Sequence, residues 1–396
     1  MLERPISKAG WTRVAFGDVV RKVNDKVDPW DSGLERYVAG EHMDTDDLRI
    51  RRWGMIGDDY LGPAFHMRFK PGQVLYGSRR TYLRKVALAD FEGITANTTF
   101  VLETKDPARL MPDLLPFLMQ TEVFHSYSIK HSKGSVNPYI NFSDLEAFDF
   151  LLPPIQEQAR LVEVLIAAQD SSENMLGLVE ATRVAQIAAF EELLRRADAK
   201  PVSLGSIMTA SPRNGYSPVA ASRETGHWVL ALSAISKWGY RPDQFKPVEV
   251  GPETLGSRIA KGDLVISRSN TRDLVGLPMV FPEDRSDVSY PDTMMRISVD
   301  PKTIGTGYLE MCLRSPKCRR QVQSFAAGTS SSMLKINGAN LRKVSVPLVP
   351  VKQQAEILVG VAQFTAALAF AERRFDETRK LQIRIANDAL SGVVTA

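Results

Sequence analysis

The sequence predicts an α+β protein with two similar globular domains, separated by two long helices packed as an antiparallel coiled coil. Three observations favour this fold: an internal duplication, two long stretches with apolar residues at helical spacing, and dense glycine and proline elsewhere. The chain has 396 residues, too many for one ordinary domain, and 44% of them are hydrophobic. This composition supplies enough apolar side chains for separate cores.

The duplication is clearest where each half of the globular sequence ends. Residues 134–158 (GSVNPYINFSDLEAFDFLLPPIQEQ) resemble residues 328–354 (GTSSSMLKINGANLRKVSVPLVPVKQQ). Five residues of the first block recur in the same order about 196 positions later: Ile140, Asn141, Leu145, Pro154 and Gln158 return as Ile336, Asn337, Leu341, Pro350 and Gln354. We therefore interpret the chain as one unit written twice.

The repeat divides the chain into four parts. We predict a first globular domain at residues 1–152, a central helical spacer at 153–200, a second globular domain at 201–347 and a C-terminal helical spacer at 348–396.

The two spacers have the pattern of long amphipathic helices. The first runs from Ile155 to about Arg196 without proline, and the second from Val351 to about Ser391. A helix of that length spans roughly 60 Å and must bury its apolar stripe, for which the other helix is the obvious partner. The alternative is a pair of long surface helices. The expected packing or subunit-docking positions are Leu161, Leu165, Leu176, Phe190, Ile357, Phe364, Phe375 and Leu381.

The globular parts read as mixed structure with short elements. Strands are expected at residues 73–76, 99–102, 148–152, 263–267 and 343–346, and helices at residues 111–124 and 308–324.

Most catalytic chemistry lacks a signature here. The five histidines show no metal-ligand spacing, the two cysteines suggest a reducing cytoplasmic setting, and no GxxxxGK[ST] loop is present. Residues 1–20 carry mixed charge, and no run of 18 apolar residues occurs, so we expect neither a signal peptide nor a membrane span. We therefore expect this chain to bind neither a metal ion nor a cofactor.

Two patterns imitate catalytic motifs. Asn137-Pro138-Tyr139 resembles the loop with which amino-methyltransferases hold a flipped base, but one proline is missing, so a turn is favoured. Pro291-Asp292 with Asp300-Pro301-Lys302, and Asp90 with Glu103-Thr104-Lys105 in the first copy, imitate a metal-dependent nuclease. Because a proline follows the aspartate in Asp106-Pro107 and in Asp300-Pro301, both places are interpreted as strand ends entering turns.

Binding chemistry is the better reading of two polar segments at matching points of the repeat. Arginine and asparagine read base edges, and hydroxyls hold phosphates. Small polar loops later in each half are candidate backbone clamps. A net charge of +4 permits a nucleic-acid partner without requiring it, and solvated surface is the competing reading. The candidate DNA-binding residues are Arg79, Arg80, Tyr82, Arg84, Lys130, Lys133 and Ser135 in the first domain, and Arg268, Ser269, Asn270, Arg272, Thr329 and Ser330 in the second.

The chain resembles the DNA specificity subunits of type I restriction-modification enzymes over essentially its whole length. The most specific segment is Leu151-Leu152-Pro153-Pro154-Ile155-Gln156-Glu157-Gln158, which enters the first long helix. The second copy departs from it, with Lys352 and Gln353 where the first has Gln156 and Glu157.

The resemblance implies that each domain reads one half of a split double-stranded DNA target, while the helices set the gap and dock two methyltransferase subunits. A separate motor-nuclease subunit would join for cleavage. S-adenosylmethionine, ATP and Mg²⁺ would then sit on those partners, and this chain would be a non-catalytic cytoplasmic subunit. Two rival readings remain: a stand-alone nuclease or methyltransferase, and a coiled-coil scaffold without DNA function.

Overall fold

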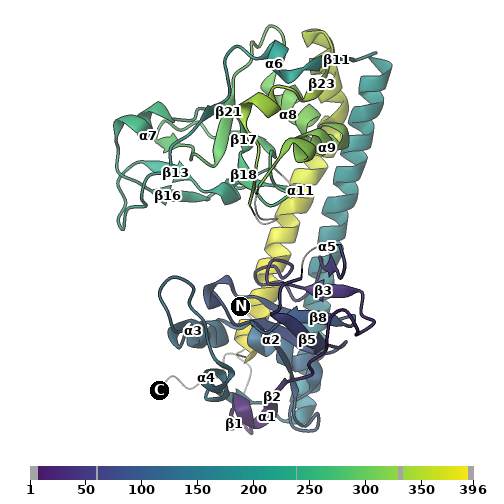
Figure 1. The fold of residues 1–396 in the computed structure, drawn as a ribbon, viewed down its shortest axis with the longest axis vertical. Coiled ribbons are helices and arrows are strands. Elements are labelled where there is room, and N and C mark those ends of the chain that lie inside the picture. Colours follow the sequence, from purple (N-terminus) through teal and green to yellow (C-terminus); the bar gives the residue numbers. More distant parts are fainter. Residues whose placement is uncertain (1–7, 59–60, 238, 329–332, 391–396) are drawn as a thin grey trace. The chain divides into compact units, whose positions relative to one another are not determined.

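The structure is a computed structural model that describes residues 8–58, 61–237, 239–328 and 333–390. The chain forms two compact units (Figure 1). The first consists of Met1–Leu176 with Arg373–Ala396, and the second of Gly177–Glu372. Each long helix contributes one end to each unit.

In the first unit, the described strands form two sheets of four. One has the order β2 (Val20–Val23), β9 (Thr99–Thr104), β6 (Val74–Gly77) and β7 (Val86–Leu88), all antiparallel. The other has the order β4 (Gly54–Met55), β3 (Arg36–Val38), β8 (Gly93–Ala96) and β5 (Phe65–Phe69), with β3 and β8 parallel. The remaining elements are β1 (Thr12–Ala15) paired with β10 (Asp149–Leu152), α1 (Phe16–Val19), α2 (Leu115–Met119), α3 (Glu122–Lys130), α4 (Phe142–Glu146), and the 3-10 turns η1 (Thr81–Leu83) and η2 (Pro112–Leu114).

The second unit repeats this topology among its described residues. The sheet β12 (Arg213–Asn214), β21 (Met294–Ile297), β17 (Leu264–Ser267), β19 (Pro278–Val280) has the same order, and β16 (Phe245–Pro247), β13 (Trp228–Leu230), β20 (Val288–Ser289) matches the other sheet. The counterpart of β5 shrinks to a single bridge between Arg258 and Ser289. The remaining elements are β11 (Lys200–Ser203) paired with β23 (Ser345–Leu348), β14 (Ile235–Ser236) with β15 (Gly239–Tyr240), β18 (Ser269–Asn270) with β22 (Leu334–Lys335), η3 (Leu232–Ala234), α6 (Leu204–Ile207), α7 (Pro252–Gly256), α8 (Thr306–Arg314), α9 (Pro316–Phe325) and α10 (Gly338–Leu341).

The long helices are α5 (Ile155–Arg196) and α11 (Val351–Leu390). Each follows a proline, Pro154 or Pro350, which lacks the amide hydrogen that a first helical turn leaves unpaired. In the second unit the two helices pack antiparallel, since Gln186 Nε2 donates to Thr365 Oγ1 at 2.8 Å and Arg183 pairs with Glu372 at 3.4 Å. The predicted fold class is confirmed.

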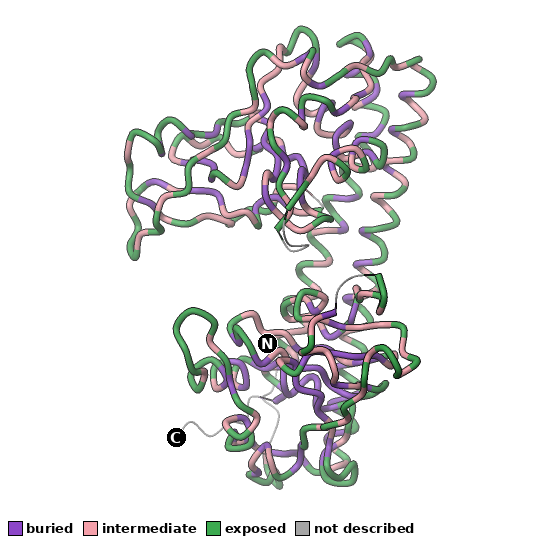
Figure 2. Tube along the Cα trace, in the orientation of Figure 1, coloured by how far each residue is buried: buried purple, intermediate pink, exposed green. Residues whose placement is uncertain are grey.

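Each unit has its own core, to which both helices contribute (Figure 2). In the first unit, Leu161 and Leu165 of α5 and Ala386 of α11 join the core of the globular part. In the second, Phe190 of α5 and Ile357 of α11 do the same. Burial of these side chains therefore holds each globular part against a helix pair rather than against one helix.

The expected apolar stripe differs in part from the structure. Leu176 is buried, whereas Phe364 and Phe375 are half-buried. Leu381 is 52% exposed and lies off the packed face, where Ile385 and Ala386 take the contacts instead.

Both predicted helices of the globular parts are broken in two. The expected helix 111–124 is interrupted before α3, and the expected helix 308–324 is interrupted at Ser315. Thr121 and Ser315 are extended, with ψ of 148° and 147°, and their hydroxyls accept hydrogen bonds from Phe124 N and Cys318 N. Each is thus an N-cap that starts a new helix. The proline after Ser315 also disfavours a helical conformation there.

Helix α11 is long and apolar enough to cross a membrane by length and composition, with a mean hydropathy of 1.4 over its best window. Helices packed inside soluble proteins meet the same test. Ile357, Val361 and Leu368 of α11 are buried within the second unit, which accounts for part of this apolar character.

Candidate nucleic-acid interface

Two loops that are far apart in the sequence form one surface on the first domain. The loop at residues 78–85 follows β6, and the loop at residues 131–140 follows α3. Ile140 N donates to Ser78 O at 3.0 Å, and Arg80 N donates to Pro138 O at 2.5 Å. The hydroxyls of Thr81 and Ser132 are 2.7 Å apart. The structure thereby brings together the two segments that the sequence marked as a basic reader and a polar clamp.

The backbone of the first loop is strained at two arginines. Arg80 (φ 50°) and Arg84 (φ 52°) adopt the left-handed conformation on either side of the 3-10 turn η1. For residues with a Cβ this conformation costs on the order of 1 kcal/mol each. Such strain persists only where surrounding contacts impose it, and it is typical of functional loops.

Most predicted side chains of this surface are exposed. Arg79 lies over the ring of Tyr139, with 5.4 Å from the guanidinium carbon to the ring centroid, and Tyr82 is 51% exposed. Arg80 and Lys130 are exposed, and no ion pair is found for either among the residues that the structure describes. The surface therefore offers positive charges next to aromatic rings, a combination that can neutralise phosphates and stack on bases.

Lys133 and Ser135 lie on the second loop of the same surface and are exposed. Lys133 Nζ is 2.9 Å from Asp144 Oδ2. This hydrogen bond lowers the pKa of the Asp144 carboxyl. Lys133 thus holds its loop onto α4, and its charge is partly neutralised.

Arg84 has internal partners. Its Nε lies 2.9 Å from Asp46 Oδ1 and its Nη2 lies 2.5 Å from Glu122 Oε1. Both carboxylates belong to the same unit, so this arginine ties the strained loop to its neighbours. The buried His125 lies beside the pair, with Nε2 3.8 Å from Asp46 Oδ1.

The second domain builds the corresponding surface with different side chains. Ile336 N donates to Arg268 O at 3.0 Å, as Ile140 N does to Ser78 O, and β18 pairs with β22 where Arg79 bridges to Tyr139 in the first domain. Arg268 Nη1 donates to Asp292 O at 3.2 Å, and Asn270 Nδ2 donates to Ser267 Oγ at 3.3 Å.

The predicted residues of the second domain differ in accessibility. Arg272 is exposed, and Arg268 and Asn270 are half-buried. Ser269 is only 3% exposed, because its strand pairs with β22, so its hydroxyl is not presented at the surface. Thr329 and Ser330 lie outside the described residues.

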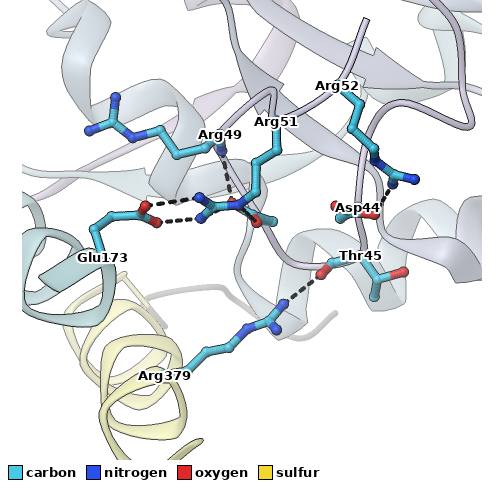
Figure 3. A network of polar contacts seen from close by, with 8 residues as sticks. Asp44, Thr45, Arg49, Arg51, Arg52, Glu173 and Arg379 are labelled. Atoms are coloured by element: carbon cyan, nitrogen blue, oxygen red, sulfur yellow. Dashed lines mark hydrogen bonds and ion pairs between the residues drawn. The ribbon is translucent and has the colours of Figure 1, made fainter. Parts of the chain in front are cut away.

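Sequence reasoning missed an anchoring network in the first unit, at residues 44–52 (Figure 3). Arg51 forms paired hydrogen bonds with Glu173 of α5, Nη1–Oε2 at 3.0 Å and Nη2–Oε1 at 2.5 Å, and its Nε is 2.7 Å from Asp47 Oδ2. Arg379 of α11 donates to Thr45 O at 2.8 Å. Burial opposes the charge on Arg51, yet the bonds to Glu173 and Asp47 raise its pKa. The sequence signal that could have indicated this network is the acidic segment DTDD (residues 44–47) followed by the basic segment RIRR (residues 49–52).

The patterns that imitated catalysis have structural roles. Ala108 N donates to Asp106 Oδ1 and Lys302 N donates to Asp300 Oδ1, both at 2.9 Å, so each aspartate forms a turn. A His–Ser contact also has the geometry of a base beside a nucleophile, since His227 Nε2 lies 2.9 Å from Ser289 Oγ. Both residues are buried, and the Ser289 hydroxyl donates to Thr254 O, so this pair is also structural. The described residues contain no group of three potential metal ligands among His, Cys, Asp and Glu.

Residues 10–175 match the family model described as type I restriction modification DNA specificity domain. This match confirms the resemblance to type I restriction-modification specificity subunits that the sequence showed.

The chain is also similar to parts of two curated specificity subunits. It is 27% identical over 177 residues to the type I restriction enzyme EcoDI specificity subunit of Escherichia coli, covering 44% of this chain and 39% of the relative. It is 26% identical over 263 residues to the EcoKI specificity subunit of E. coli strain K12, covering 61% of this chain and 56% of the relative. The matched part therefore spans less than two thirds of these relatives.

Among solved structures, the HsdS subunit from Thermoanaerobacter tengcongensis is 17% identical, with 98% of both chains covered and a TM-score of 0.41. The type I restriction-modification S subunit from M. genitalium is 13% identical, with 97% of both chains covered and a TM-score of 0.43.

Proposed function

We propose that this chain is the sequence-specific DNA recognition subunit of a type I restriction-modification complex, each domain reading one half of a bipartite double-stranded target. The observation that carries the proposal is the surface made by residues 78–85 and 131–140, with exposed Arg79, Arg80 and Tyr82 on a fixed backbone. The same backbone contact recurs at Arg268 and Ile336 in the second domain. The family match supports this assignment.

The residues proposed to contact DNA are chosen by the exposure of their side chains. Arg79, Arg80, Tyr82, Lys130 and Ser135 of the first domain have exposed side chains. In the second domain Arg268, Asn270 and Arg272 carry the proposal, while Ser269 is set aside because it is buried. Arginine and asparagine side chains recognise guanine and adenine edges, and serine hydroxyls hold phosphates.

The long helices are proposed to set the spacing of the two half-sites and to dock methyltransferase subunits. Several of their apolar side chains are exposed, among them Val184 and Leu178 on α5 and Val359, Phe370 and Leu381 on α11. Exposed apolar side chains of this kind are typical of a surface that binds another protein through apolar contacts. A motor-nuclease subunit completes the proposed complex.

The chain itself is proposed to be non-catalytic and cytoplasmic, with S-adenosylmethionine, ATP and Mg²⁺ bound by the partner subunits. Incubation of the purified chain with DNA, Mg²⁺ and S-adenosylmethionine tests this directly. We expect neither cleavage nor methyl transfer. Turnover without partners would instead favour a stand-alone nuclease or methyltransferase.

The decisive experiment is to map methylated bases across the genome with three versions of the gene: intact, deleted, and carrying a foreign second domain in place of residues 201–347. We expect the methylated motif to disappear on deletion and only one half of it to change on domain exchange. An unchanged motif after exchange would contradict the assignment. A scaffold without DNA function predicts no motif that depends on this gene.

A further inference from the structure

A hollow of about 470 Å³ lies within the second unit, between the helix pair and the globular domain. Its walls come from α5, α8, α9, α11 and the turn between β14 and β15. Leu277, Met311 and Leu368 give one part of the wall an apolar character. A volume of this size is typical of small-molecule sites.

Four cationic residues from separate elements line this hollow. They are Arg183 on α5, Lys237 beside β15, Arg314 on α8 and Arg319 on α9. The carboxylates in the wall are Glu310 and Asp273, and the charges of Glu372 and Glu180 also act on Arg183. The charged residues that line the hollow itself are therefore four cations and two acids. Burial and the proximity of Arg314 lower the pKa of Arg183 and of Arg319 to about 10.

The arginines are held in place by the protein itself. Arg314 donates to Glu310 Oε1 at 3.2 Å, to Lys237 O at 3.1 Å and to Pro278 O at 2.5 Å. Arg319 donates to Val275 O at 2.8 Å and to Asp273 O at 3.0 Å. A guanidinium has five N–H donors, so the described contacts leave donors on both side chains. Fixed donors beside a hollow are pre-organised for an acceptor that carries negative charge.

The corresponding place in the first unit can be located from the internal repeat. Arg379 lies as far from the start of α11 as Arg183 lies from the start of α5, and His125 follows the cap Thr121 as Arg319 follows the cap Ser315. There the carboxylate of Asp46 fills the space, 2.9 Å from Arg84 Nε and 3.8 Å from His125 Nε2. The field of Arg379 also acts on that carboxyl, opposing the rise in pKa caused by burial.

The second unit keeps one cationic position, with Arg183 in place of Arg379, and changes the segment that supplies the acid. Asp46 follows Thr45 in the first unit, and the corresponding turn of the second unit carries Lys237, with position 238 outside the described residues. Arg319 replaces the neutral His125, and Arg314 adds a further charge. The second unit therefore has more cationic residues around this place than the first, while Glu310 and Asp273 are the acids in its wall.

We propose that this hollow binds a small organic oxyanion, a carboxylate or phosphate group carried on an apolar body. The charged group would meet Lys237, Arg314 and Arg319, and the apolar body would lie against Leu277, Met311 and Leu368. The hollow adjoins the loop of the second domain that is proposed to read DNA, since Asp273 in its wall directly follows Arg272. The proposed ligand is a small molecule, and its binding does not require DNA recognition.

The test is calorimetric titration of the full chain at low ionic strength with two charged probes, adenosine 5′-monophosphate and phthalate, and with their uncharged counterparts, adenosine and phthalamide. We expect at least one charged probe to bind and both uncharged probes to fail. Lys237→Gln should weaken that binding about tenfold, because one charge-assisted hydrogen bond is lost. Lys237 is exposed, so this variant should keep the melting temperature of the parent.

Lys246→Gln is the matched control, since Lys246 is an exposed lysine of the same domain that does not line the hollow. It should bind the charged probe like the parent chain. The proposal fails if neither charged probe binds, or if the two lysine variants lose affinity equally. It also fails if only duplex DNA, titrated in parallel, depends on Lys237, because the group bound would then be a backbone phosphate.

Discussion

Gln158 and Gln354 make the same three hydrogen bonds at the starts of the two long helices. Gln158 Oε1 accepts from Met111 N, and its Nε2 donates to Arg109 O and Pro153 O, all at 2.8 Å. Gln354 Oε1 accepts from Gly305 N, and its Nε2 donates to Thr303 O and Val349 O, all at 2.9 Å. Both side chains are buried, at 0% and 2% exposure. Each therefore fastens the start of its helix to the loop that leads into the helices of its own domain.

Replacing either glutamine with leucine should destabilise the corresponding unit. Gln158→Leu leaves one amide and two carbonyl groups without their partner, and each unpaired buried group costs about 1–3 kcal/mol. We expect the free energy of unfolding to fall by about 3 kcal/mol, measured by urea denaturation, with a similar loss for Gln354→Leu. The control is Gln156→Leu at an exposed position of the same helix, which should change stability by less than about 0.5 kcal/mol. Equal effects at 156 and 158 would contradict the role assigned to the buried amide.

The Arg51–Glu173 contact should couple the loop at residues 44–52 to helix α5. The two side chains are about one third exposed, so solvent reduces the interaction, and a double-mutant cycle with Arg51→Ala and Glu173→Ala should give a coupling of about 1 kcal/mol. Arg51→Lys should lose most of that coupling, because lysine cannot make the paired hydrogen bonds. The measurement is the free energy of unfolding of the four variants. Additive effects would show that the contact contributes nothing to the anchoring.

The sequence predicted the large features because they depend on local patterns. Pro154 and Pro350 mark helix starts for a local reason, and the recurrence of Ile140 as Ile336 revealed the shared topology. The breaks at Thr121 and Ser315 were also locally encoded, as capping hydroxyls, but the apolar pattern running through them favoured single helices.

The details of the candidate site depend on contacts between distant segments. Arg79 meets Tyr139 across two loops, and Ser269 is buried because Lys335 pairs with it. The ion pair between Arg51 and Glu173 likewise joins a loop to a helix more than a hundred residues away in the sequence. A charge pattern predicts that such arginines are polar surface or binding residues, but only the fold decides which partner each one finds.

Exposed Arg80 should contribute one phosphate or base contact to DNA binding. Arg80→Ala should weaken or relax recognition of one half-site only, and should make the slope of log K against log salt less steep by about 0.9 if the contact is to a phosphate. Fluorescence anisotropy with duplexes that carry either half-site changed gives both quantities. Lys105→Ala is a suitable control, because the Lys105 ammonium is bound to Gly17 O at the end of β9. An Arg80 variant that affects both half-sites equally would refute the assignment of one domain to one half.

The buried His125 should make the first unit sensitive to acid. Burial, aided by the charge of Arg84, lowers the pKa of His125 to about 3, against an unfolded value near 6.5. Between pH 3 and pH 6.5 this histidine therefore binds a proton in the unfolded chain but not in the folded one. Its contribution to the free energy of unfolding is fully present above pH 6.5 and is lost as the pH falls toward 3. Between pH 7 and pH 5 the free energy of unfolding should fall by about 2 kcal/mol through this residue. His125→Gln should remove that part of the pH dependence, whereas His66→Gln, at a more accessible position, should retain it. Urea denaturation at the two pH values compares the three proteins, and an unchanged pH dependence in His125→Gln would show that this imidazole is not held neutral by its surroundings.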